Sequence, residues 1–346
     1  RDIAYWDEFD TALNFMLQID QGIGVRDFFS RLFAISNEHR MVTSRLMFAS
    51  SYWLTGTVDF SVISWLGNLS LFALCGLLVW TAGTAARRLR MALVLAMLMF
   101  QLEHYENFLW SGSSIDHFQV VLLAGLAVVG VARGTRAGLL LGALAAALAT
   151  FTLAHGIVVW GIGALMLAHA RRFKPLGIWG ALGALAAIGF FAGFHLNTAQ
   201  RFADPSVAGA LTVARFWLSL LGSVPALGHE TAAPWLGGGL LLAMGLAAWS
   251  GALRRESIAF PLACYAVAAL GLIAIGRAAE AGGAMHSRYY VLSALAWALT
   301  IFLWLERYSH PRRPYSLLWG CVPTLVVFNV LANRSFSPKA DSWLEC

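Results

Sequence analysis

The sequence predicts an all-α fold, a polytopic bundle of transmembrane helices. Hydrophobic residues make up 59% of the chain and charged residues only 12%, whereas a soluble domain carries about 25% charged residues. The mean hydropathy is +0.68. Apolar stretches near the roughly 20 residues that a helical span needs recur along the chain, without the alternation typical of a membrane β-strand. These observations indicate one helical membrane domain.

Residues 1–56 are expected to form a loop on the outer face of the membrane, ahead of a helical bundle at 57–346. Two apolar stripes at helical spacing indicate helices that lie along the membrane surface: Phe9, Leu13 and Leu17 before Gly22 and Gly24, and Phe28, Phe29, Leu32 and Phe33 after them. Membrane anchoring explains these apolar residues, but it does not explain the acids Asp7 and Glu8 beside them.

The bundle is expected to contain about ten spans, because apolar runs alternate with charged breaks. We place them near 59–82, 89–108, 117–133, 137–154, 156–170, 176–195, 235–252, 257–276, 289–306 and 315–332.

Clusters of basic residues in alternate turns predict the orientation of the spans. Only two acids, Glu256 and Glu306, accompany thirteen basic residues on this side: Arg87, Arg88, Arg90, Arg133, Arg136, Arg171, Arg172, Lys174, Arg254, Arg255, Arg307, Arg312 and Arg313. The positive-inside rule makes this side cytoplasmic. The outer, periplasmic face then carries sixteen of the 18 acids, and we expect the chemistry there.

Two stretches test this topology. Residues 137–170 must cross the membrane twice, because Arg136 and Arg171 share a side. The apolar stretch 209–226 is not expected to be a full span, since it would move Arg254 outside. Arg215 near its middle instead favours a helix in the outer interface.

Polar residues from separate segments converge on the outer face in this topology. The candidate catalytic residues are Asp7 and Glu8, and the candidate substrate-binding residues are Glu38, His39, Arg40, Arg45, Glu103, Glu106, Asn107, His286, Arg288 and Tyr289. Glu103 and Glu106 are three residues apart, so a helix would turn both the same way. Paired acids beside His and Arg suit group transfer from a phosphate-bearing donor, because a carboxylate accepts the proton of the attacking hydroxyl and arginines hold the phosphate.

Simpler explanations exist for each candidate. Asp7 and Glu8 also suit capping of the next helix, where acids favour the helix dipole. Arg40, Arg45 and Arg288 also suit contact with lipid phosphates. The histidines show no spacing typical of metal ligands, so no metal site is predicted. A divalent cation, Mg²⁺ or Mn²⁺, stays open as a cofactor.

The order of several short motifs resembles that of bacterial membrane proteins related to the GT-C glycosyltransferases. The motifs are Trp6-Asp7-Glu8, then Asn37-Glu38-His39-Arg40 with Arg45, then Glu106-Asn107, and Ser287-Arg288-Tyr289. The resemblance implies a polyprenyl-phosphate-linked sugar as donor, Asp7 as general base and Glu8 as its neighbour or a metal ligand. It also implies a further span upstream of Arg1, eleven in total, and fits a metal-independent, inverting transfer.

The expected function is therefore sugar transfer to an envelope glycan, lipid or protein acceptor at the periplasmic face of a bacterial inner membrane, in contact with membrane lipids. Nucleic acid is not an expected partner, because the basic residues behind the net charge of +6 lie between spans. One alternative is a transporter or flippase for a lipid-linked substrate, although four predicted spans have no ionisable residue in their middles. The other is a non-catalytic subunit of an envelope complex.

Overall fold

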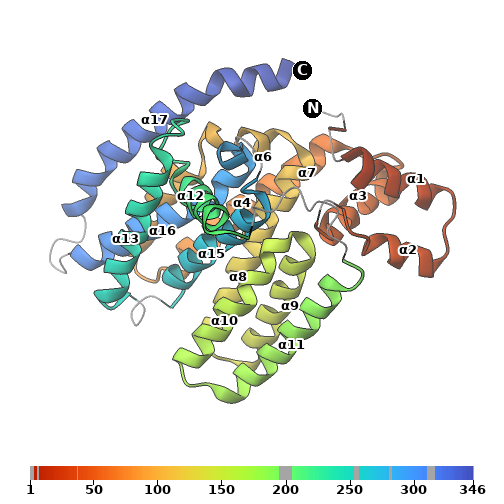
Figure 1. Cartoon of the computed structure of the whole chain (residues 1–346), viewed down its shortest axis with the longest axis horizontal. Helices are drawn as coiled ribbons and strands as arrows, with labels where there is room; N and C mark the ends of the chain where they lie inside the picture. Colours follow the sequence, from red (N-terminus) through yellow and green to blue (C-terminus); the bar gives the residue numbers. More distant parts are fainter. Residues whose placement is uncertain are drawn as a thin grey trace. The chain divides into compact units, whose positions relative to one another are not determined.

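The computed structural model describes residues 4–5, 8–36, 38–194, 205–252, 257–279, 283–309 and 316–345. Over these residues the chain is all-helical (Figure 1). It divides into two compact units: unit 1 comprises Arg1–Ala73 and Glu106–Leu196, and unit 2 comprises Leu74–Tyr105 and Asn197–Cys346. The separation of residues 1–56 from 57–346 stays a prediction.

Unit 1 contains the opening helices and the first bundle. Its elements are η1 (Phe9–Leu13), α1 (Asn14–Asp20), α2 (Val25–Leu32), α3 (Val42–Thr55), the first part of α4 (Phe60–Thr81), α6 (Tyr105–Leu109, beginning in unit 2), α7 (Ser111–Ser113), η3 (Ser114–Phe118), α8 (Gln119–Ala132), α9 (Arg136–Thr152), η4 (Ala154–Ile157), α10 (Val158–His169) and α11 (Phe173–Phe191). The elements α7, η3 and α8 form one continuous helix, Ser111–Ala132, with a π-helical turn at η3.

The helices α8 to α11 pack side by side (Figure 1). Glycines allow α8 and α9 to approach closely, because a Cβ atom at Gly130 would lie 2.5 Å from the carbonyl oxygen of Gly138. Small residues at a helix crossing are typical of membrane bundles.

The turn after α8 and the turn after α10 lie at the same end of unit 1. Arg172 donates a hydrogen bond of 2.6 Å to the carbonyl oxygen of Gly134. This contact confirms that residues 137–170 fold back as two helices, α9 and α10. Because α11 starts beside this turn and continues for 19 residues, its last residues lie at the opposite end of unit 1.

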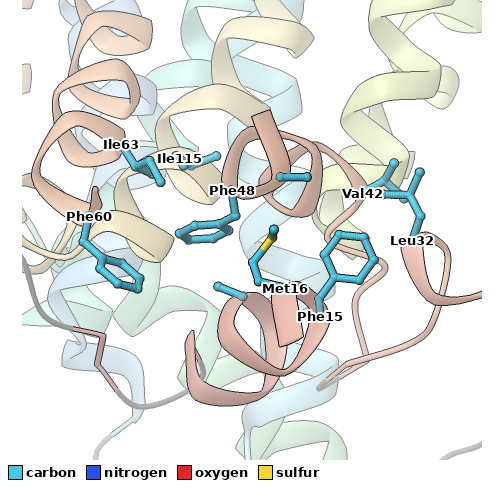
Figure 2. Packing of buried hydrophobic residues seen from close by; sticks show 10 residues of the cluster. Phe15, Met16, Leu32, Val42, Phe48, Phe60, Ile63 and Ile115 are labelled. Carbon is cyan, nitrogen blue, oxygen red and sulfur yellow. The ribbon is translucent and has the colours of Figure 1, made fainter. Parts of the chain in front are cut away.

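The opening helices share an apolar core with α4 and η3 (Figure 2). Phe15 and Met16 of α1 pack in this core with Phe48 of α3. The predicted helices are present, but the stripe of Phe9, Leu13 and Leu17 is not the core face, since Phe9 is 58% and Leu17 61% exposed. The outward direction of these residues fits their predicted anchoring role.

Unit 2 contains the second part of α4, then α5 (Ala85–Met99), η2 (Leu102–His104), α12 (Val207–Gly222), α13 (Ala233–Trp249), α15 (Ala259–Arg277), η5 (Gly283–Met285), η6 (Ser287–Tyr289), α16 (Tyr290–Tyr308) and α17 (Ser316–Glu345). Glu306 of α16 pairs with Arg90 at 2.6 Å and with Arg87 at 3.2 Å. The beginning of α5 and the end of α16 therefore meet, as the grouping of their basic turns predicts. Arg254, Arg255, Arg312 and Arg313 lie outside the described residues.

Three predicted spans have other bounds in the structure. The span at 89–108 is not one helix, because α5 ends at Met99 and short helical pieces follow. The span predicted from 117 begins earlier, at Ser111. The prediction began late because serines and an acid precede the apolar part of this helix. The span predicted at 315–332 belongs to a longer helix, α17, which continues through Pro323 and Pro338 to Glu345.

Five helices among the described residues are long and apolar enough to cross a membrane: Phe60–Thr81, Ser111–Ala132, Phe173–Phe191, Ala259–Arg277 and Ser287–Tyr308. Only 22% of the apolar part of α11 is buried, and Leu185 and Ile188 are exposed on it. Such a helix suits contact with lipid. Four further apolar helices are shorter than a typical span of roughly 20 residues: Arg136–Thr152, Ala154–His169, Val207–Gly222 and Ala233–Trp249. The ten spans and the interfacial position of 209–226 therefore stay predictions.

Candidate functional site

The opening segment folds onto the end of unit 1 that lies away from the Gly134–Arg172 contact. Arg40 donates hydrogen bonds to the carbonyl oxygens of Phe190 and Ala192, at the far end of α11. The Nδ1 atom of His39 accepts a hydrogen bond of 3.2 Å from the backbone of Ala154, at the end of α9. We call this region the polar end of unit 1. It brings together polar side chains from the opening segment, η3 and η4.

Glu8 is a buried acid of the polar end, 1% exposed, and both of its carboxyl oxygen atoms accept hydrogen bonds. Its Oε1 atom accepts hydrogen bonds from the Ser111 hydroxyl and from the backbone N–H of Gly112 at 2.6 Å, and its Oε2 atom accepts one from the Tyr5 backbone at 2.7 Å. Burial raises the pKa of Glu8, while these hydrogen bonds oppose the rise. Glu8 therefore caps the beginning of the helix Ser111–Ala132. Its side chain does not cap η1, the helix that directly follows Glu8 in the sequence.

Arg40 is buried, and backbone carbonyl groups surround its guanidinium. The Nε and Nη2 atoms donate to Phe190 at 3.0 and 2.7 Å, Nη2 also donates to Ala192, and Nη1 donates to Phe33. These contacts connect the chain after α2 to the end of α11. They give Arg40 a structural task, and its predicted role in donor binding stays a prediction.

The interior of the polar end contains two charged residues, Arg45 and Asp116, and the hydroxyl group of Ser44. The Nη1 atom of Arg45 donates to the carbonyl oxygens of Leu32, Ala34 and Arg40 at 3.1, 2.6 and 2.8 Å. Burial lowers the pKa of Arg45 to about 10, and the negative charge of Asp116 partly offsets this effect. The Ser44 hydroxyl donates to Asp116. The group holds a buried cation and a buried acid near each other.

Two histidines extend this group. The rings of His117 and His155 are stacked, with centroids 6.3 Å apart and planes inclined by 24°. Asp116 and His117 both lie in the π-helical turn η3, and such turns inside α-helices often occur at functional sites. Asp116 is five residues from the start of its helix, a rise of about 8 Å.

The other unit 1 candidates lie at the same end. Asn107 is buried and accepts a hydrogen bond of 2.6 Å from the Ser113 hydroxyl. Glu106 is half-buried one position before it, and Glu38 is half-buried with a backbone φ of 64°. Asp7, together with Trp6 and Asn37 of the recognised motifs, lies outside the described residues.

The remaining candidates belong to unit 2. Glu103 is fully buried, and the Ser287 hydroxyl donates to its backbone carbonyl oxygen at 2.6 Å. The guanidinium of Arg288 lies 5.3 Å from the centre of the Tyr289 ring, and the His286 ring packs edge-on against the same tyrosine. These residues gather at the end of unit 2 away from the Arg90–Glu306 pair, because η2 follows α5 and η6 precedes α16.

The arrangement offers acids, cations and hydroxyls, but no cluster of metal ligands. In the part of the chain that the structure describes, no three His, Cys, Asp or Glu side chains come together as a metal site. Sequence reasoning did not select Ser44 and Ser111. The two serines carry no charge, and they are identified only by their hydrogen bonds to Asp116 and Glu8 in the folded chain.

Comparisons with protein-family models, curated proteins and solved structures find no significant match to this chain.

Proposed function

We propose that this protein is a GT-C-like membrane glycosyltransferase with about ten spans. It transfers a sugar from a polyprenyl-phosphate donor to an envelope glycan, lipid or protein acceptor at the periplasmic face of a bacterial inner membrane. The polar end of unit 1 faces the periplasm in this proposal, and Asp7 acts as general base.

The observation that carries the proposal is the separation of polar and basic ends within unit 1. Glu8, Arg45 and Asp116 gather at one end, whereas the Gly134–Arg172 contact marks the other. A membrane protein has little reason to bury ionisable groups unless they bind or react with something. The basic end suits the cytoplasmic side.

The surface of the opening helices supports a position at the lipid boundary. Phe29 and Trp53 are 54% and 57% exposed, and Arg26 and Arg31 are exposed on α2 beside Phe29. Exposed aromatic and apolar side chains with arginines nearby suit a helix in the headgroup region. A lipid-linked donor would reach the polar end from the same boundary.

The proposed reaction is a single displacement at the sugar. Asp7 accepts the proton of the acceptor hydroxyl while the oxygen of that hydroxyl forms a bond to the anomeric carbon. The bond from that carbon to the carrier phosphate breaks, and the polyprenyl phosphate leaves with the electron pair. A general base contributes typically about 10²- to 10⁴-fold to such a step.

Glu8 suits a positioning role better than the role of base. Three donors already occupy its two oxygen atoms, so it has little capacity to accept a further proton from a substrate.

Sugar transfer by the full chain in liposomes tests the proposal, with a panel of polyprenyl-phosphate-linked sugars and a lipid acceptor extract. We expect Asp7→Asn to lower the rate at least about 100-fold without changing the melting temperature. Glu8→Gln should lower the rate and the melting temperature together, because it loses hydrogen bonds. Asp27→Asn, an exposed acid of α2, is the matched control. Full activity of Asp7→Asn would contradict the mechanism.

One observation favours the transporter alternative. The segment after α5 is interrupted and contains the fully buried Glu103, and broken helices with buried ionisable groups are typical of transporters. Movement of an intact lipid-linked sugar across liposomes, without any transfer product, would support that function instead.

A further inference from the structure

Unit 2 contains a break between two helical segments whose backbone groups are satisfied by a distant helix. Asn329 of α17 donates to the carbonyl oxygens of Met97 and Phe100 at 2.9 and 3.2 Å. Asn333, one turn further along α17, accepts a hydrogen bond of 2.8 Å from the backbone of Leu102. The two amides therefore fix the break as a defined structure.

Glu103 lies inside this break, and its carboxyl group has no hydrogen-bond partner among the described residues. The residue is 0% exposed, and neither Oε1 nor Oε2 receives a hydrogen bond. Glu8, the other buried glutamate, has three donors. An ionised carboxylate without donors costs several kcal/mol to bury, so the geometry favours a neutral, protonated Glu103.

The charged and titratable groups around Glu103 come from the elements that pack against η2. These elements carry His104 in η2 itself, Arg288 and Tyr289 in η6, Tyr290 at the start of α16, and Arg334, Lys339 and Asp341 in α17, and of these groups only the charge of Lys339 acts appreciably on Glu103. Lys339 is the cation whose charge favours ionisation of Glu103. It is exposed, and its Nζ atom lies 4.8 Å from the centre of the Phe336 ring. His104 is fully buried, and its Nε2 atom lies 3.4 Å from the carbonyl oxygen of Leu98.

We propose that Glu103 is a proton-binding site in the break between α5 and α6, with Lys339 controlling release of the proton. Release of H⁺ to solvent leaves a carboxylate that needs contact with water, because its site is fully buried in the closed break, so release requires η2 and α17 to separate far enough to admit water. Proton binding then stabilises the closed break. This inference stands whether or not the chain transfers a sugar.

Infrared spectroscopy of the full chain in detergent tests the protonation state directly. We expect wild type near pH 7 to show the C=O stretch of a protonated carboxyl group, and Glu103→Gln to lose it. Glu106→Gln changes a half-buried glutamate three residues away, and it should leave the band unchanged. A band whose intensity is the same in Glu103→Gln as in wild type would overturn the proposal, because Glu103 would then contribute no protonated carboxyl group.

Lys339→Gln provides a test that does not alter the buried site itself. Removing this exposed cation should make Glu103 bind its proton roughly threefold more tightly, a shift of about half a pH unit in the same infrared titration. Arg334→Gln on the same helix should have no such effect. An unchanged titration in Lys339→Gln would contradict the role of Lys339.

The stability of the protein should also depend on pH through this group. The fully buried carboxyl group of Glu103 has no hydrogen-bond donors among the described residues, so the folded protein binds the proton more tightly than the unfolded chain. The resulting stabilisation is complete below the ordinary pKa of a glutamate, about 4.3, and is lost as the pH rises to where the folded protein releases the proton. We expect the melting temperature to fall over this range in wild type and to fall less in Glu103→Gln. Equal slopes would argue against the proton site.

Discussion

At the scale of single residues, the buried charges of unit 1 are held mainly by backbone groups. Arg40 and Arg45 donate to carbonyl oxygens, and Glu8 accepts two of its hydrogen bonds from backbone N–H groups. Hydrogen bonds to charged groups contribute more than neutral ones, about 1.5–3 kcal/mol each. These residues therefore fix the opening segment in place.

Arg40→Lys tests this account. The planar guanidinium donates from three nitrogen atoms to carbonyl oxygens on both sides, and a lysine ammonium group does not reproduce that geometry. We expect a loss of about 1.5–3 kcal/mol, measured as unfolding in detergent. Arg31→Lys, at an exposed position of α2, should change stability by less than about 0.5 kcal/mol. Equal stability of the two variants would contradict the structural role of Arg40.

Residue types alone predicted the presence of functional polar groups but not their partners. Arg40 and Arg45 are visible as cations in an apolar context, which indicates burial or lipid contact. The Phe190 and Ala192 carbonyl oxygens that accept hydrogen bonds from Arg40 lie about 150 positions later in the sequence, and no local pattern points to them. Sequence reasoning therefore assigned both arginines to phosphate and overlooked their backbone contacts.

At the scale of helices, close packing depends on glycine where α12 meets α13. A Cβ atom at Gly237 would lie 2.0 Å from the carbonyl oxygen of Leu218, whereas one at Gly239 would meet nothing within 4 Å. The contact involves backbone, which does not move aside as a flexible side chain does. The two helices are in contact because residue 237 lacks a side chain.

Gly237→Ala and Gly239→Ala form a matched pair on the same helix. We expect Gly237→Ala to lower stability by at least about 1–3 kcal/mol through overpacking. Gly239→Ala should be neutral or stabilising by up to about 1 kcal/mol, because alanine favours helix. Melting temperatures in detergent measure both. Similar effects of the two changes would show that α12 and α13 do not approach as closely as described.

Apolar periodicity predicted most helices, because hydrophobic length decides which segments form spans. It did not predict the break after Met99. Where the run 89–108 is interrupted, Asn329 and Asn333, more than 200 residues away, satisfy freed backbone groups, and no local pattern points to these partners. The π-helical turn at Ser114–Phe118 also leaves no signature in hydropathy.

At the scale of the whole molecule, the basic turns of each unit lie at one end of that unit, and its candidate polar residues lie at the other end. The grouping of Arg136 with Arg171, and of Arg90 with Arg307, was predicted from the sequence. The contacts Arg172–Gly134 and Arg90–Glu306 confirm that the corresponding turns meet within their own unit. The distribution of basic residues predicts which turns lie at the same end of a unit, because basic turns of a membrane protein are expected on one side of the membrane.

The central claim is that the opening segment, docked on the polar end of unit 1, forms the donor site. Photo-crosslinking in liposomes with a light-activated polyprenyl-phosphate-sugar analogue, followed by peptide mass spectrometry, measures this most directly. The account predicts labelled peptides from residues 1–56, displaced by unmodified donor and reduced in Glu8→Gln. Labelling confined to helices outside residues 1–56, with no change in Glu8→Gln, would contradict it.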